Sequence, residues 1–189
     1  MQKILTGICL ALAWTAASAG TLFEAGTEFP VVGWRPVSSQ LARAVLNASP
    51  DTEELLNEEI EEKGLKRHYR NYFVWKPIPV SATGKQFNFV RPAFDPYMQS
   101  LYGAHTFFYW IVGANGSVLL TSASDRLAVL SETHNGMRDL LISQCHGGWC
   151  FETRQVFDGR RYGPGVCEAS EIANPASKKP CDKVVFGGE

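Results

Sequence analysis

The first third of the chain carries its apolar residues at the spacing of helices. The segment from Gln40 to Leu46 has one narrow apolar stripe, and it follows a pair of serines that can cap its start. The triplet Ser49-Pro50-Asp51 then offers a hydroxyl cap, a proline for the first turn and an acid at the positive end of the helix dipole. This second helix runs to Lys63 and ends at Gly64. We therefore expect two helices within residues 38–64.

From Tyr69 onward the pattern becomes that of strands. The strongest strand is expected from His105 to Val112, where large apolar residues follow one another without a break after Thr106. Alternate residues of a strand point to opposite faces, so Phe107 and Tyr109 lie on one face while the aromatic residues between and after them lie on the other. Because both faces are apolar, we expect a central strand that is covered on both sides.

Turn signals divide the rest of this region at regular intervals. Asn115-Gly116, Asn135-Gly136 and Asp158-Gly159 are typical hairpin turns, and Ala123-Ser124-Asp125 adds another between the first two. Spacings of about nine to twelve residues between such turns indicate an antiparallel meander.

The order of these elements predicts an α+β fold, with N-terminal helices packed on an antiparallel β-meander. We expect one domain over residues 20–189, made of a helical part at about 38–64, a mainly β part at about 69–165 and an irregular tail at 166–189. Asp95-Pro96 is a further helix start, and it predicts a short helix that ends at Gly103.

The first nineteen residues predict a cleaved signal peptide. A positive start at Lys3 precedes an apolar run from Ile4 to Ala16, and Ala17-Ser18-Ala19 has the small residues that signal peptidase accepts. The alternative is a retained membrane helix, but a run of this length spans only about 20 Å of a hydrocarbon core of about 30 Å. No later segment reaches eighteen apolar residues, so we expect no integral membrane segment after cleavage.

Composition narrows the class of protein. The chain has 45% hydrophobic residues and a formal net charge of −1, so it has enough apolar side chains to build a core and is not of the disordered class. The balance of 18 basic and 19 acidic residues leaves no surplus to neutralise phosphates, which argues against a nucleic-acid partner.

Export decides how the cysteines are interpreted. Four of them remain after the signal peptide, and an even number in an oxidising compartment predicts disulfides. Three pairings are possible, and we favour Cys145–Cys150 with Cys167–Cys181 because neighbours along the chain close the smaller loops. A zinc site is the competing interpretation, but the chain has no C-x2-C pair among these residues, so we predict no metal ligands.

The loop between the first two of these cysteines is the candidate binding site. It reads Cys145-His146-Gly147-Gly148-Trp149-Cys150, so a disulfide would hold an imidazole and an indole on a short protrusion with two conformationally free glycines. A rigid loop loses little entropy on binding, and Trp is a frequent hot-spot residue at interfaces. The alternative is a hairpin tip whose Trp149 packs back on the sheet.

Three resemblances bear on the fold, the compartment and the candidate loop. Two segments within residues 134–162 resemble the turn-strand-turn pattern of FG-GAP-like repeats, namely Asn135–Ser143 and Phe157–Tyr162. Such repeats build propeller blades and often hold calcium. Here Glu132-Thr133-His134 replaces the acidic calcium loop. The chain is also similar to uncharacterised proteobacterial exported proteins with such a hairpin, which implies a periplasmic or secreted bacterial protein. The loop 145–150 looks like the disulfide-closed, histidine-bearing loop of exported lysozyme inhibitors.

No motif of a known catalytic site is present, and no catalytic residue or cofactor is predicted. We therefore expect a protein-binding module of the periplasm, for example an inhibitor or immunity protein that occludes an enzyme attacking the cell envelope. One alternative is an exported hydrolase whose catalytic residues are dispersed along the chain. Another is a structural component of the envelope that docks through the acidic helix with Glu58, Glu59 and Glu62.

Overall fold

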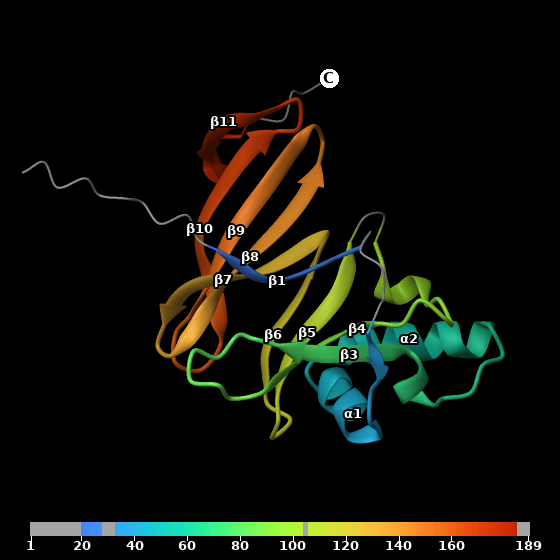
Figure 1. The fold of residues 1–189 in the computed structure, drawn as a ribbon. Helices are drawn as coiled ribbons and strands as arrows, with labels where there is room; N and C mark the ends of the chain where they lie inside the picture. Colours follow the sequence, from blue (N-terminus) through green and yellow to red (C-terminus); the bar gives the residue numbers. More distant parts are fainter. Residues whose placement is uncertain (1–19, 28–32, 104–105, 185–189) are drawn as a thin grey trace, which may run out of the picture.

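The computed structural model describes residues 20–27, 33–103 and 106–184. Two antiparallel sheets pack face to face, and two helices cover the outer face of one of them (Figure 1). The signal peptide predicted for residues 1–19 lies outside the described residues, as does His105 at the start of the strand predicted there.

The five-stranded sheet is built in chain order, and each strand pairs with its neighbour in sequence. Its strands are β2 (Arg35–Pro36), β3 (Phe73–Ile78), β4 (Phe87–Pro92), β5 (Phe107–Gly113) and β6 (Val118–Ser124).

The six-stranded sheet begins with the first strand of the chain beside the seventh and then continues in chain order. Its strands are β1 (Thr21–Gly26), β7 (Arg126–His134), β8 (Met137–His146), β9 (Trp149–Phe157), β10 (Tyr162–Glu171) and β11 (Asn174–Pro180). The far ends of β8 to β11 extend beyond the five-stranded sheet (Figure 1).

Strand β5 explains the layered architecture. Phe107, Tyr109 and Ile111 are fully buried in the core between the sheets, while Trp110 and Val112 are fully buried in the core under the helices. The prediction of a central strand covered on both sides is confirmed. Alternation places large side chains on each face, so each face needs its own apolar layer.

The helices form where the sequence predicts them. Helix α1 spans Ser39–Asn47 and helix α2 spans Pro50–Glu62. Ser38 caps α1, because its hydroxyl accepts a hydrogen bond from the Leu41 N–H at 3.1 Å. Ser49 occupies the cap position of α2 but makes no side-chain cap bond there, and its hydroxyl instead accepts the indole N–H of Trp110 at 3.0 Å.

The α+β class and the antiparallel meander are confirmed in outline, but the protein is mostly β and its strands divide between two sheets. The segment after Asp95-Pro96 differs from the predicted helix: this peptide bond is cis, and only the three residues Gln99–Leu101 form a 3-10 helix. Two further 3-10 helices span Tyr69–Asn71 and Cys181–Lys183.

The tail also differs from the prediction of an irregular segment at 166–189. It contains the second half of β10 and all of β11, and its last five residues lie outside the described part. Strand β11 reads Asn-Pro-Ala-Ser-Lys-Lys-Pro, so nothing in its side chains signals a buried strand. Prolines and lysines are typical of sheet edges, because they discourage pairing with another chain.

Glu59 connects α2 to the segment that precedes β5. One of its carboxylate oxygens accepts the Gln99 N–H at 2.7 Å and the Lys63 ammonium at 2.6 Å, and the other accepts the Ser100 N–H at 2.7 Å. Burial raises the pKa of this carboxyl, but the hydrogen bonds from Lys63, Ser100 and Gln99 outweigh burial and lower the pKa from 4.5 to about 2.

We expect Glu59→Gln to destabilise the protein at neutral pH and to have little effect in strong acid. A carboxyl whose pKa is lower in the folded state contributes stability above its unfolded pKa of 4.5, and this stability disappears as the pH falls toward 2. The shift corresponds to roughly 3 kcal/mol, and screening of the partly exposed Lys63 reduces the expected loss to about 2 kcal/mol.

Urea unfolding of both proteins at pH 7, 4 and 2.5 measures this difference. The exposed Glu58→Gln is the matched control and is expected to follow the wild type at every pH. A Glu59→Gln deficit that stays constant from pH 7 to 2.5 would show that the ionised carboxylate is not the stabilising group.

Candidate functional site at the disulfide-linked hairpin

Two disulfides cross-link the strands at the end of the six-stranded sheet. Cys145 of β8 is bonded to Cys150 of β9, and Cys167 of β10 is bonded to Cys181 in the 3-10 helix after β11. These are the two pairs that the sequence favoured. Disulfides are typical of proteins that fold outside the reducing cytoplasm.

The loop between Cys145 and Cys150 is tighter than the four-residue protrusion that we expected. Gly147 and Gly148 alone form the turn, with φ of 56° and 82°, so both occupy the left-handed region that a two-residue hairpin of this type requires. His146 and Trp149 belong to the strands and lie directly opposite each other in the ladder, next to the disulfide pair. Directly paired residues share a face of the sheet, so the imidazole and the indole stand side by side.

The two predicted binding side chains differ in exposure. His146 is exposed and its ring stacks on Phe151 with centroids 4.9 Å apart. Trp149 is half-buried, and the ammonium of Lys179 lies 4.0 Å from the centroid of its ring. The indole therefore packs partly along the sheet, as the alternative interpretation proposed, while one cation from β11 covers part of it.

The hairpin is anchored at its tip and at its base. At the tip, the Ile172 N–H of the turn between β10 and β11 donates to the Gly148 carbonyl at 2.9 Å. At the base, the Cys145 N–H donates to the Asp125 carboxylate at 2.6 Å. Contacts from two separate turns thus fix the direction in which the hairpin projects.

A polar hollow of about 480 Å³ lies beside the disulfide. Its lining combines the two cysteines with two carboxylates, one guanidinium and two hydroxyls, namely Asp125, Glu152, Arg126, Thr27 and Ser143. Arg126 is paired with Glu24, and the hydroxyl oxygen of Ser143 has no hydrogen-bond partner among the described residues although Ser143 is only 7% exposed. The hollow therefore presents polar groups beside the base of the hairpin.

A cluster of polar side chains around one buried carboxylate, on β7, β8 and β9, was missed by the sequence analysis. Asp139 is fully buried, and its carboxylate binds the guanidinium of Arg154 at 2.6 Å and the Nδ1 atom of His134 at 2.7 Å. A histidine oriented by a buried carboxylate is the arrangement of a general base. Within the described part of the chain no hydroxyl or thiol is hydrogen-bonded to His134, and the bonds that Asp139 makes join β7, β8 and β9.

The described residues show neither a metal-binding cluster nor a helix that could span a membrane. The described residues contain no group of three or more His, Cys, Asp and Glu side chains that could hold a metal ion. None of the helices in the described ranges has both the length and the apolar character needed to cross a membrane.

Comparison with known proteins adds no assignment to this geometry. The FG-GAP-like resemblance of residues 134–162 and the likeness to exported proteobacterial proteins remain predictions. No family model matches the chain, and neither a curated protein nor a solved structure matches it.

Proposed function

We propose that this protein is an extracytoplasmic protein-binding module that acts through the hairpin of residues 145–150. The observation that supports the proposal best is the disulfide directly behind a two-glycine turn, which places His146 and Trp149 side by side at the projecting end of the six-stranded sheet. The bacterial periplasm is the compartment we propose, in line with the predicted signal peptide and the disulfides.

Rigidity favours binding by this hairpin. Binding by a flexible loop costs entropy for every side chain that becomes fixed, whereas this turn is already held by the disulfide, the Gly148 carbonyl and the Asp125 carboxylate. A narrow, rigid projection fits a concave partner surface better than a flat one. We therefore propose an enzyme cleft as its target, which makes an inhibitor or immunity protein the expected role.

The two side chains contribute differently. The exposed imidazole of His146 can donate or accept a hydrogen bond inside a cleft. Trp149 offers the larger apolar surface, and its contact with Lys179 holds the ring in place before a partner arrives. We expect truncation of Trp149 to have the greater effect on affinity.

Trp149→Ala is expected to weaken partner binding by about thirtyfold, and His146→Ala by about tenfold, in line with hot-spot losses of about 1–2 kcal/mol. Partners are isolated from a bacterial envelope extract with the wild-type protein, and their affinities for each variant are then measured by surface plasmon resonance. Enzyme partners are also assayed for loss of activity when the wild-type protein is added.

Matched controls separate the hairpin from other exposed rings. His68→Ala and Tyr97→Ala remove exposed aromatic side chains elsewhere on the surface and are expected to leave affinity unchanged. Equal recovery of the same partners by wild type and both hairpin variants would remove the hairpin from the proposal. Binding lost only after charge reversal at the exposed Glu58 and Glu62 would favour the structural-component alternative instead, and Glu59 is left unchanged because it is buried and stabilises the fold.

A further inference from the structure

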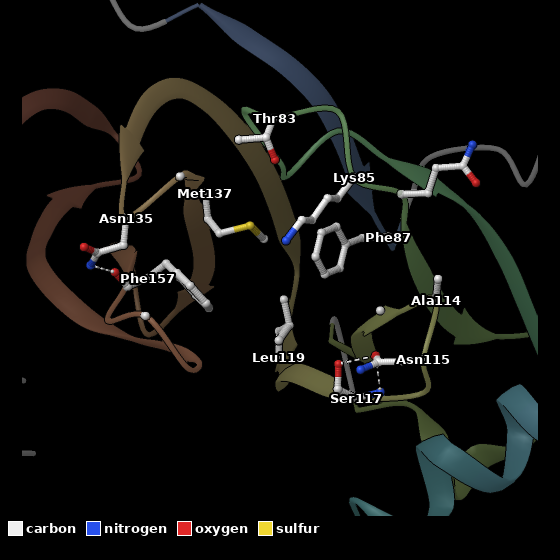
Figure 2. A pocket seen from close by; sticks show the side chains of 14 residues that line it. Thr83, Lys85, Phe87, Ala114, Asn115, Ser117, Leu119, Asn135, Met137 and Phe157 are labelled. Atoms are coloured by element: carbon white, nitrogen blue, oxygen red, sulfur yellow. Dashed lines mark hydrogen bonds between the residues drawn. The ribbon is translucent and has the colours of Figure 1, made fainter.

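A second hollow, at the opposite ends of β8 and β9 from the hairpin tip, opens between the two sheets (Figure 2). Its volume is about 660 Å³, which is within the range of sites that hold small molecules. The walls come from the loop before β4, the turn between β5 and β6, the turn between β7 and β8, and the end of β9. The hollow therefore exists only because the two sheets meet at this end.

The hollow has an apolar lining with one charge. Phe87 and Leu119 line it from the five-stranded sheet, and Met137 and Phe157 line it from the six-stranded sheet. Lys85 is the one charged side chain among the described lining residues, and its ammonium points into the hollow between Met137 and Phe87 (Figure 2). No ion pair is formed by Lys85 within the described ranges, so its charge is available to a ligand.

The loop that carries Lys85 is fixed to the opposite sheet. Ser81 is only 5% exposed, and its hydroxyl accepts the N–H groups of Thr83 and Lys85 at 3.1 and 3.2 Å. Across the gap, the Ala82 N–H donates to the Gly136 carbonyl at 3.1 Å, and a guanidinium nitrogen of Arg138 donates to the Ser81 carbonyl at 2.8 Å. These bonds hold the backbone of Lys85 at the mouth of the hollow before a ligand is present.

Amide and hydroxyl groups lie at the two ends of the hollow. Asn115 accepts hydrogen bonds from the N–H and hydroxyl of Ser117 at 3.1 and 2.7 Å at one end, and Asn135 donates to the Phe157 carbonyl at 2.8 Å at the other. The apolar side chains lie between these ends, in the part that Lys85 overhangs (Figure 2). A ligand that fits this lining has an aliphatic body and a single anionic group.

We propose that this hollow binds a small amphipathic carboxylate, with its anionic group on Lys85 and an aliphatic chain between Leu119, Met137 and Phe157. The ammonium offers a charge-assisted hydrogen bond to the carboxylate, and the apolar walls remove the chain from water. Flexible Met and Leu side chains adapt to a chain of variable conformation more readily than rigid rings do. This site is separate from the hairpin, so its test does not depend on the proposed function.

The test uses decanoate as the probe. The readout is NMR of the isotope-labelled methionine methyl groups, in protein whose disulfides are formed. Met137 lines the hollow, while Met98 is fully buried under the helices and serves as an internal reference. Decanoate is expected to shift the Met137 methyl resonance and leave that of Met98 in place. Decanol has the same chain without the charge and is expected to bind about tenfold more weakly, a ratio of the size that a hydrogen bond to a charged group contributes.

Lys85→Gln is expected to weaken decanoate binding about tenfold and to leave decanol binding unchanged, while Lys85→Glu weakens decanoate binding further. Lys66→Gln, at an exposed lysine outside the hollow, is the matched control and is expected to bind both probes like the wild type. The proposal is overturned if decanoate leaves Met137 unshifted or binds Lys85→Gln as tightly as wild type. Tighter binding of naphthoate than of decanoate would also overturn it, because the hollow would then select aromatic ligands.

Discussion

Trp110→Ala is expected to lower the free energy of unfolding by about 3–5 kcal/mol, a loss typical of a fully buried Trp or Phe replaced by Ala. Trp110 has no exposed surface and lies in the core between the helices and the five-stranded sheet. Its ring meets Phe73 edge to face with centroids 5.5 Å apart, and its indole N–H donates to Ser49 at the start of α2. The variant therefore leaves a cavity and also removes the bond that ties α2 to β5.

Thermal and urea unfolding of the variant measure this loss. For a domain of this size, 3 kcal/mol corresponds to a decrease of roughly 6–12 °C in Tm. Ser49→Ala removes only the hydrogen bond and is expected to lower the unfolding free energy by about 1 kcal/mol, which separates that bond from the packing. If Trp110→Ala unfolds no more easily than the exposed control Tyr97→Ala, then the helices do not depend on this face of the sheet.

The features that the sequence predicted correctly are those encoded by neighbouring residues. The two apolar faces of β5 follow from alternation within one strand, and the serine cap of α1, the first-turn proline of α2 and the glycine after α2 follow from adjacent positions. The same holds for the turn at Asn135-Gly136, where φ values of 50° and 78° match the conformation for which these residue types are selected. Local pattern also favoured the observed disulfides, because each joins the nearest partner along the chain.

The features that the sequence did not predict depend on distant pairing. Strand β1 is placed by its ladder with β7, about a hundred residues away, and β11 is placed by backbone bonds to β10 rather than by apolar side chains. The hollow around Lys85 needs turns from both sheets to meet, and no single segment of sequence contains that information. The candidate hairpin was found in the sequence because cysteine, glycine and Trp stand next to one another.

Asp139 is a buried charge whose partner the sequence pattern also did not identify. Its neighbours in β8 read as an ordinary strand, and its partner Arg154 is fifteen positions away. The register of β8 against β9 places Arg154 opposite Leu141, on the face that Asp139 shares. The sequence pattern alone does not give this register. It therefore does not show that Arg154 is the partner that offsets the free-energy cost of burying the Asp139 carboxylate.

Arg154→Leu is therefore expected to lower the free energy of unfolding by about 3–5 kcal/mol, because it leaves a carboxylate of zero exposure without its cation. Asp139→Leu is expected to cost less, since the side chain of Arg154 is 34% exposed and its charge can reach water. Replacing both residues by Leu removes both charges, so the double variant is expected to be more stable than Arg154→Leu alone.

Urea unfolding of the two single variants and the double variant completes a double-mutant cycle for this pair. Arg67→Leu removes a cation from an exposed pair with Glu61 at 3.5 Å, and it is expected to change the unfolding free energy by less than about 1 kcal/mol. The decisive comparison is between the loss of unfolding free energy in the double variant and the sum of the losses in the two single variants. If the losses of the single variants simply add in the double variant, the two charges do not stabilise each other, and packing rather than the ion pair keeps β8 and β9 together at this point.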